Sequence, residues 1–332
     1  MDHTGARTTQ TRRPSQTRSQ ITTRLTAAST ADDVVEGLDL GGRRAVVTGA
    51  GAGIGRETAR SLARAGAEVT LAVRRIDDAQ EIAREIRAET GNEAVDVRPL
   101  DLADLASVAA FSKEWAGPLD LLINNAGIMA LPEPTRTEQG WEMQFAVNHL
   151  GHFALALGLH DALAEASGAR IVSVSSSGHH VSPVVFDDIH YRQRAYDPWS
   201  AYGQSKTANV LFAVAATTRW ATEGIVANAV MPGGIMTGLQ RHVPAEVRAQ
   251  WEQVPSNKTP QQGAATTLVA AVAPEFAGVG GRYLEDGGEA PIVEDDAETD
   301  GVHGVRHWAL DPTAAERLWE TSEESLRSTR DR

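Results

Sequence analysis

Short apolar segments alternate with amphipathic segments through most of the chain. The apolar segments are four to six residues long and rich in aliphatic residues, which is typical of buried strands. They cover 44–48, 68–73, 94–98, 119–123, 170–174, 225–230 and 281–284. Helical patterns cover 30–35, 57–65, 78–90, 105–115, 137–166, 202–214, 259–272 and 311–327. This alternation predicts an α/β fold, a single doubly wound Rossmann domain whose parallel sheet of about seven strands carries helices on both faces.

Residues 1–31 differ in composition from the rest of the chain. They hold five Arg and one acidic residue, a balance of +4; the whole chain of 332 residues carries −13, so the remainder carries −17. With almost nothing apolar to bury, 1–31 is predicted to be a disordered tail before a single domain at 32–325. No apolar stretch follows the Arg pair at 12–13, which excludes a twin-arginine signal, and the lack of an apolar face disfavours an organelle transit peptide.

The remaining composition narrows the classes of function. The acidic net charge argues against nucleic acid as a partner, and no apolar run reaches about 18 residues, so no membrane span is expected. The chain has no Cys, which excludes thiolate metal sites and suits a reducing cytoplasm, the location we expect. Two His pairs, His149 with His152 and His303 with His307, lack a third ligand, so no metal is predicted.

A glycine-rich turn directly follows the first predicted strand. Residues 49–55 read Gly-Ala-Gly-Ala-Gly-Ile-Gly, and a predicted helix comes next. Glycine lets the backbone approach a pyrophosphate, and the helix N-terminus supplies N–H donors and the positive end of a dipole. A tight turn without a ligand is the alternative. The strand–turn–helix context favours a dinucleotide site that includes Gly49, Gly51, Gly53, Ile54 and Gly55.

Two arginines follow the second predicted strand. In NAD-binding units an acidic residue about 20 positions after the glycine turn binds the ribose hydroxyls, but here Arg74 and Arg75 stand there. A carboxylate would repel a 2′-phosphate, whereas guanidinium binds it. The pair therefore favours NADP(H) over NAD(H); the alternative is that both side chains only face solvent beside Asp77 and Asp78.

A tyrosine and a lysine stand four residues apart at the start of the helix predicted from residue 202. Tyr202 and Lys206 therefore share one helix face. A free phenol has a pKa near 10, and a nearby cation lowers that pKa toward the range useful for acid–base catalysis. The spacing predicts a catalytic tyrosine tuned by a lysine; a surface Tyr beside a surface Lys is the alternative.

Polar residues gather where other predicted strands end. Asn124-Asn125-Ala126-Gly127 closes the strand at 119–123, and three serines, 175–177, close the strand at 170–174. Asn148 lies inside a predicted helix, where a buried amide is costly unless it is hydrogen bonded. Long inserts at 178–200 and 235–258 follow, and loops of that length are usually functional.

In chain order these motifs resemble the short-chain dehydrogenase/reductase family over roughly residues 40–320. The matching residues are Thr48-Gly49-x-x-x-Gly53-Ile54-Gly55, Asp101-Leu102, Asn124-Asn125-Ala126-Gly127, Asn148, Ser176, Tyr202-x-x-x-Lys206 and Pro232-Gly233-x-x-x-Thr237. Within the family the chain is similar to the retinol-dehydrogenase-like branch, through 147–153, the insert before Tyr202, and 258–264. The tail at 1–31 does not resemble a membrane anchor, so a membrane-bound retinoid role is not carried over.

The resemblance implies a role for each matching residue. Tyr202 would exchange a proton with the substrate oxygen, and Lys206 would lower its pKa and bind the nicotinamide ribose. Ser176 would hold the substrate oxygen, with Ser175 as the nearest competitor, and Asn148 would order a water in a proton relay through Lys206. The other implied cofactor contacts are Asp101 and Leu102 at the adenine, Asn125, Ala126 and Gly127 on the adenosine side, and Pro232, Gly233 and Thr237 toward the nicotinamide.

We therefore expect an NADP-dependent oxidoreductase that interconverts an alcohol and a carbonyl, with reduction of a hydrophobic aldehyde or ketone as its direction. Hydride transfer would come from the cofactor, while the protein supplies positioning and one tuned acid–base group. The alternatives are a non-catalytic dinucleotide-binding regulatory protein and a C=C reductase on the same fold. The partner is a small-molecule alcohol or carbonyl, and the resemblance implies a homodimer or homotetramer, with dimers formed through the two long helices.

Overall fold

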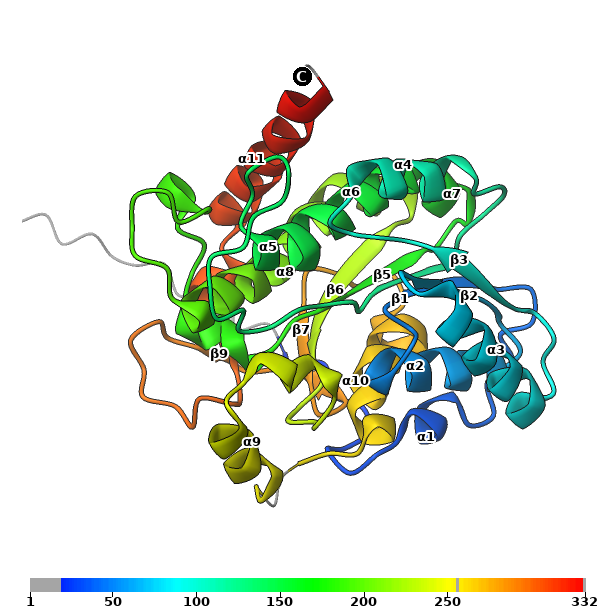
Figure 1. Ribbon diagram of the computed structural model, residues 1–332. Coiled ribbons are helices and arrows are strands. Elements are labelled where there is room, and N and C mark those ends of the chain that lie inside the picture. The colour runs from blue at the N-terminus through cyan, green and yellow to red at the C-terminus, as the bar shows by residue number, and fades with distance from the viewer. Residues whose placement is uncertain (1–18, 255–256, 331–332) are drawn as a thin grey trace, which may run out of the picture.

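The computed structural model describes residues 19–254 and 257–330, and within them one eight-stranded sheet forms the centre of the molecule (Figure 1). The strands are β1 (Arg44–Thr48), β2 (Glu68–Val73), β3 (Val95–Pro99), β4 (Leu121–Asn124), β5 (Arg170–Val174), β6 (Val226–Met231), β7 (Tyr283–Glu285) and β8 (Gly288–Glu289). They lie in the order β3-β2-β1-β4-β5-β6-β7-β8, and every neighbouring pair is parallel except β7 with β8. The predicted doubly wound parallel sheet is confirmed. Its order reverses between β1 and β4, where sheets of this type bind ligands beyond the C-terminal strand ends.

Helices cover both faces of the sheet and create two cores. One layer holds α1 (Ala31–Val35), α2 (Gly53–Arg64), α3 (Ile76–Thr90) and α10 (Pro260–Val272), and the other holds α4 (Leu105–Lys113), α6 (Gly151–Gly158), α8 (Pro198–Trp220) and α11 (Pro312–Arg330). Strand β1 shows the alternation that links them: Ala45 and Val47 pack in the first core, and Val46 packs in the second. All three are fully buried, as expected for a central parallel strand.

The helix predicted for 137–166 begins later than expected and changes form. Residues before it make a tight turn in which the Thr137 N–H donates to the Trp141 carbonyl at 3.0 Å, and Gly140 has φ +82°. Helical structure starts with α5 (Met143–Phe145), passes through a π-helical turn at Ala146–Leu150, and continues as α6 and α7 (His160–Glu165). Such turns are frequent at functional sites, and Asn148 lies inside this one.

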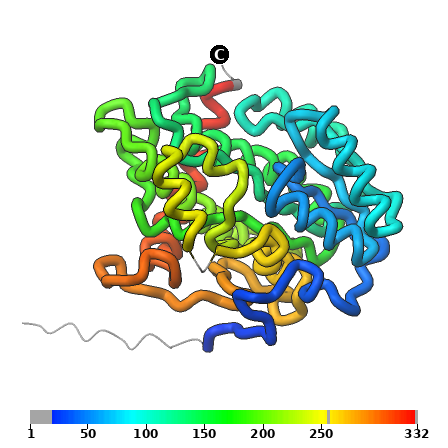
Figure 2. Tube along the Cα trace, turned by 60° about the horizontal axis from the view of Figure 1, so that its bottom comes forward, coloured from blue at the N-terminus to red at the C-terminus, as the bar shows by residue number. Residues whose placement is uncertain are grey.

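Part of the predicted tail is folded. Residues 19–30 run beside the β8 region (Figure 2), where the main chains of Ile21 and Glu289 are joined at 2.9 Å and Thr23 Oγ1 donates to the Gly287 carbonyl at 2.6 Å. Ile21 and Leu25 pack against the first core, and Thr30 caps α1. The expected boundary at residue 31 is therefore too late, because Ile21 and Leu25 provide apolar side chains to bury. Residues 1–18 lie outside the described part of the chain.

The C-terminal helix α11 packs on the two long helical segments of the second layer. Trp319 contacts Phe153 of α6 and stacks on Phe212 of α8, with ring centres 4.9 and 6.2 Å apart, and Ser322 Oγ lies 2.8 Å from His149 Nε2. The chain itself thus covers part of the surface through which the resemblance implies dimers. Across 19–254 and 257–330, no helix is long and apolar enough to cross a membrane.

Candidate active site

Helix α8 brings Tyr202 and Lys206 together in the interior. Asp197 caps this helix by accepting the Ser200 N–H at 2.6 Å, and Pro198 occupies its first turn, so the helix begins one turn before Tyr202. Both side chains are buried, and Lys206 Nζ lies 5.5 Å from the centre of the Tyr202 ring. The predicted pairing on one helix face is therefore present.

Burial dominates the proton affinities of this pair. It raises the pKa of Tyr202 to about 12, and a hydrogen bond with Ser176 offsets only part of that increase. It also lowers the pKa of Lys206 to about 8. Lys206 Nζ donates to the Val174 carbonyl at 3.0 Å and not to the phenol. Burial and Ser176 account for the shift in the pKa of Tyr202, and the expectation that Lys206 lowers this pKa stays a prediction.

Ser176 stands opposite Tyr202 at the end of β5. Its hydroxyl accepts the Gly178 N–H at 3.0 Å and hydrogen bonds the Tyr202 phenol. Gly178 is needed here, because a Cβ on it would lie 2.8 Å from the Tyr202 ring. The competitor Ser175 is buried and donates to the Lys206 carbonyl at 2.8 Å, so its hydroxyl serves the main chain of α8. This geometry favours Ser176 for the role at the substrate oxygen.

The amide of Asn148 connects three parts of the site. Its Oδ1 accepts the Ile128 N–H, and its Nδ2 donates to the Ile128 carbonyl and to Ser205 Oγ, each at 2.9 Å. These bonds satisfy a fully buried amide, as the sequence required. A Cβ on Gly127 would lie 3.4 Å from Asn148 Oδ1 and 3.6 Å from Lys206 Nζ. The turn after β4 therefore lies within ordinary contact distance of Asn148 and Lys206.

The glycine turn after β1 forms a tight cradle against the turn after β4. Gly49 and Gly53 have φ +67° and +56°, which favours glycine. A Cβ on Gly55 would lie 2.4 Å from Asn125 Nδ2, and that amide donates to the Thr48 carbonyl at 2.8 Å. Helix α2 begins at Gly53 and directs its free N–H groups toward this cradle. The residues present fit the pyrophosphate of a dinucleotide.

The predicted residues at the outer end of this cradle differ in polarity and exposure. Arg74 and Arg75 are both exposed beyond β2. Arg75 pairs with Asp78 at 2.9 Å, whereas Arg74 forms no ion pair with any residue that the structure describes. Asp101 Oδ1 accepts the Ala103 N–H at 2.9 Å, and the neighbouring Leu102 is buried against α6.

Thr237 closes the opposite end of the cradle, beyond the Pro232–Gly233 turn. Its hydroxyl accepts the Leu239 N–H at 3.2 Å, and a Cβ on Gly53 would lie 3.3 Å from its methyl group. The loop after β6 thus packs against the start of the glycine turn.

Known proteins resemble this chain in sequence and in fold. The family model described as short chain dehydrogenase matches residues 43–248. A curated relative from Streptomyces antibioticus, named probable oxidoreductase, is 52% identical over 300 residues, which is 88% of this chain and all of that protein. The chain belongs to the short-chain dehydrogenase family. It is an oxidoreductase of that family, and the expected class is confirmed.

Two other members show the breadth of the likeness. Retinol dehydrogenase 11 of Mus musculus is 42% identical over 253 residues, covering 75% of this chain and 79% of that protein, which confirms the resemblance to that branch. The crystal structure of a gluconate 5-dehydrogenase from Burkholderia cenocepacia J2315 in complex with NADP and tartrate has a TM-score of 0.60 and 28% identity, covering 77% and 97% of the two chains. This short-chain dehydrogenase thus shares its fold with an NADP-bound dehydrogenase.

In this family member an apolar wall, which comes partly from the two predicted inserts, covers Tyr202. Met129, Ala130 and Val243 are buried against the tyrosine. Trp199, Leu239, Val247 and Trp251 pack around them, partly from α9 (Ala245–Glu252). No sequence motif marks these residues, because their types are ordinary core types and only the fold assembles them.

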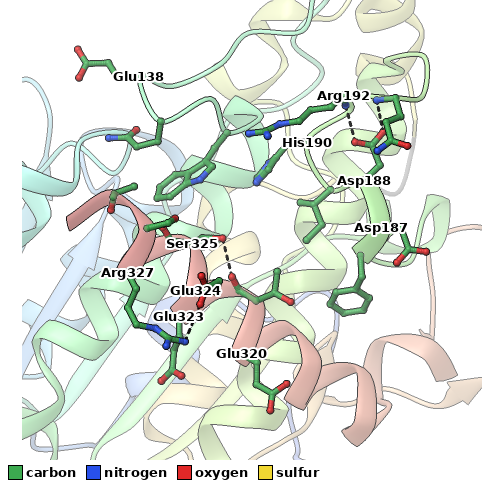
Figure 3. A pocket seen from close by; sticks show the side chains of 18 residues that line it. Glu138, Asp187, Asp188, His190, Arg192, Glu320, Glu323, Glu324, Ser325 and Arg327 are labelled. Carbon is green, nitrogen blue, oxygen red and sulfur yellow. Dashed lines mark hydrogen bonds and ion pairs between the residues drawn. The ribbon is translucent and has the colours of Figure 1, made fainter. Parts of the chain in front are cut away.

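A separate cavity of about 1180 Å³ lies between α11 and residues 186–193 (Figure 3). Acidic side chains dominate its rim, including Asp187, Glu320 and Glu324. Its lining includes part of the predicted insert at 178–200 but none of the predicted catalytic or cofactor-binding residues.

Proposed function

We propose that this protein is an NADP-dependent oxidoreductase that reduces a hydrophobic aldehyde or ketone to the alcohol. The observation that supports it is the buried phenol of Tyr202, which lies beneath an apolar wall with the Ser176 hydroxyl close enough to lower its pKa. Bound NADPH supplies a hydride to the carbonyl carbon. Tyr202 gives its proton to the carbonyl oxygen, while Ser176 donates a hydrogen bond to the same oxygen. Because the pKa of Tyr202 lies at about 12, the phenol is protonated at neutral pH, which suits an acid in the reductive direction.

The adjoining polar residues position Tyr202 and return a proton to it. Lys206 is cationic below its pKa of about 8 and binds the nicotinamide ribose beside Gly127. Asn148 supports a relay of protons through Lys206. Since both amide protons of Asn148 are donated to protein groups, the side chain acts by holding the turn at Ile128 against α8.

The cofactor preference rests on Arg74. Its guanidinium has no carboxylate partner within the described chain, so it is available to a 2′-phosphate, whereas Arg75 is paired with Asp78. The NADP complex of the related gluconate 5-dehydrogenase supports the class of cofactor.

The apolar wall defines the substrate class. Two indoles, from Trp199 and Trp251, lie with ring centres 5.7 Å apart near Tyr202. An aliphatic or aromatic group attached to the reacting carbonyl would be buried there, and each added CH₂ would contribute about 0.8 kcal/mol.

The test follows NADPH and NADH consumption with a series of straight-chain aldehydes and ketones, in wild type and Tyr202→Phe. We expect turnover with NADPH that rises with chain length and falls at least about 100-fold in the variant, while NADPH still binds. Turnover of enals at the C=C bond alone would move the assignment to the alkene reductase. Turnover that prefers NADH would refute the role given to Arg74.

A further inference from the structure

A short C-terminal segment, residues 304–306, lies against the turn that carries Ser176. It belongs to the small parallel pair β9 (Ile292–Val293) and β10 (Val305–Arg306), separate from the main sheet. The family match ends at residue 248, so nothing in it assigns a role to this segment. Yet His179, three residues after Ser176, is bonded to Arg306 across 127 positions of sequence.

His179 is fully buried and bonded at both ring nitrogens. Its Nδ1 lies 2.7 Å from the Ser176 carbonyl, and its Nε2 lies 3.2 Å from the Arg306 N–H. A carbonyl only accepts and an N–H only donates, so Nδ1 carries the proton and Nε2 accepts. The ring is therefore neutral and in a single tautomer. Burial, which lowers the pKa of His179 to about 3, agrees with that state.

The surrounding groups hold the C-terminal segment in place. His180 Nε2 donates to the Gly304 carbonyl at 3.0 Å, and the Glu285 carboxylate accepts the Gly304 N–H at 3.0 and 3.1 Å. The Val305 N–H donates to the Pro291 carbonyl at 2.9 Å. With the bond from Arg306, three consecutive N–H groups and one carbonyl of this segment are fixed.

We propose that His179 is a positioning residue for Ser176. One ring nitrogen of His179 donates to the Ser176 carbonyl, and the other accepts the main-chain N–H of Arg306. Through these two bonds the C-terminal segment sets the direction of the Ser176 hydroxyl toward Tyr202. Only the expected effect on catalysis rests on the proposed function. The bonding of His179 stands independently of that function.

Arg306 offers a test of one N–H group. Its φ of −64° already fits proline, and the preceding residue lies in a strand, so Arg306→Pro removes the donor without a forced change of backbone. The substitution also removes the guanidinium, which donates to the carbonyls of Glu294 and Ala297. Arg306→Ala loses the same side chain and keeps the N–H, so it is the matched control.

We expect kcat for carbonyl reduction to be at least about tenfold lower in Arg306→Pro than in Arg306→Ala, with NADPH affinity equal in the two variants. The pKa governing alcohol oxidation should also rise in Arg306→Pro, because the hydrogen bond with Ser176 lowers the pKa of Tyr202. His179→Asn, which can keep the donor to Ser176, should retain more activity than His179→Phe. Equal kcat values and pH profiles in the two Arg306 variants would overturn the proposal.

An activity-independent measurement separates this inference from the proposed function. In ¹⁵N-histidine-labelled wild type, the signal of His179, identified by its loss in His179→Asn, should show a protonated Nδ1 and an unprotonated Nε2 down to pH 5. Arg306→Pro should shift the Nε2 resonance, and Arg306→Ala should not. A protonated Nε2, or titration near pH 6.5, would refute the inference even in an active enzyme. An inactive wild type with the expected spectrum would refute the proposed function alone.

Discussion

On the proposed cofactor side of the site, residues 44–127, the turns after the neighbouring strands β1 and β4 contact each other. Asn125 reaches Thr48 across two strands that are paired in the sheet. On the proposed substrate side, Tyr202 and Ser176 depend on segments from 239–251 and 283–306 that pack on them from far along the chain. The first side follows from the topology of a parallel sheet, whereas the second depends on contacts that topology does not impose.

This difference suggests how the two sides vary separately. A chain can change its substrate wall without disturbing the glycine cradle, because few side chains belong to both. Lys206 is such a shared residue, since its Nζ lies near Gly127, Val174 and the Tyr202 ring.

The largest expected effect comes from replacing that shared residue. Lys206→Met keeps the length of the side chain but removes its charge, so turnover should fall by roughly 10²–10⁴-fold and NADPH affinity should fall as well. Tyr202→Phe should lose turnover alone. Steady-state kinetics with a tryptophan-fluorescence titration of NADPH measures both. Unchanged NADPH affinity in Lys206→Met would place Lys206 on the substrate side only.

Arg74→Ala should change the cofactor side without affecting the substrate side. We expect the preference for NADPH over NADH in kcat/KM to drop by about 10- to 100-fold, the effect of one charge-assisted contact. Arg75→Ala is the control and should change the preference by less than about threefold, because that guanidinium is paired with Asp78. An equal drop in both variants would contradict the assignment.

The cradle can be filled at one position with a matched control at another. In Gly55→Ala, the new Cβ would meet Asn125 Nδ2 at 2.4 Å and the Gly49 carbonyl oxygen at 2.6 Å, so we expect a loss of about 1–3 kcal/mol in the free energy of unfolding. In Gly51→Ala, the nearest atom is Val73 Cγ1 at 3.7 Å, an ordinary contact. Urea denaturation compares the two, and equal stabilities would show that the cradle yields more readily than its geometry indicates.

A further effect concerns the stability of the second core in acid. Burial lowers the pKa of His149 to about 3 and of His152 to about 4, from an ordinary 6.5. Below pH 6.5 these rings bind protons in the unfolded chain but not in the folded one. Their contribution to the free energy of unfolding is therefore fully present above pH 6.5 and is lost as the pH falls toward 4. The loss is at most about 1.4 kcal/mol per pH unit for each ring. The double variant His149→Phe with Ser322→Ala should lose less stability than wild type between pH 7 and 5 in urea denaturation. A steeper loss would contradict the neutral state of His149.

Local patterns in the sequence predicted the sheet and the pairing of Tyr202 with Lys206 well. Strand β1, the glycine turn and α2 are continuous in sequence, so their apolar spacing and residue types carry the signal. The same holds for Thr30, whose capping of α1 needs only residues three positions apart.

Other features left no local signal. The π-helical turn around Asn148 and the packing of Ile21 near Glu289 depend on distant partners. The pKa of Tyr202 depends on how completely it is buried, and that burial comes from the wall that includes Val243. The bond of His179 with Arg306 joins residues 127 positions apart, so no local pattern marks it.

The bond between His179 and Arg306 also has a consequence for the order in which the protein becomes functional during synthesis. The glycine turn after β1 can pack against the turn after β4 soon after both segments leave the ribosome. The Ser176 turn must wait for 127 more residues, which takes about 6 to 25 seconds at ordinary rates of translation. A nascent chain would therefore carry both the β1 and β4 turns of the cradle well before the turn that faces the substrate is fixed.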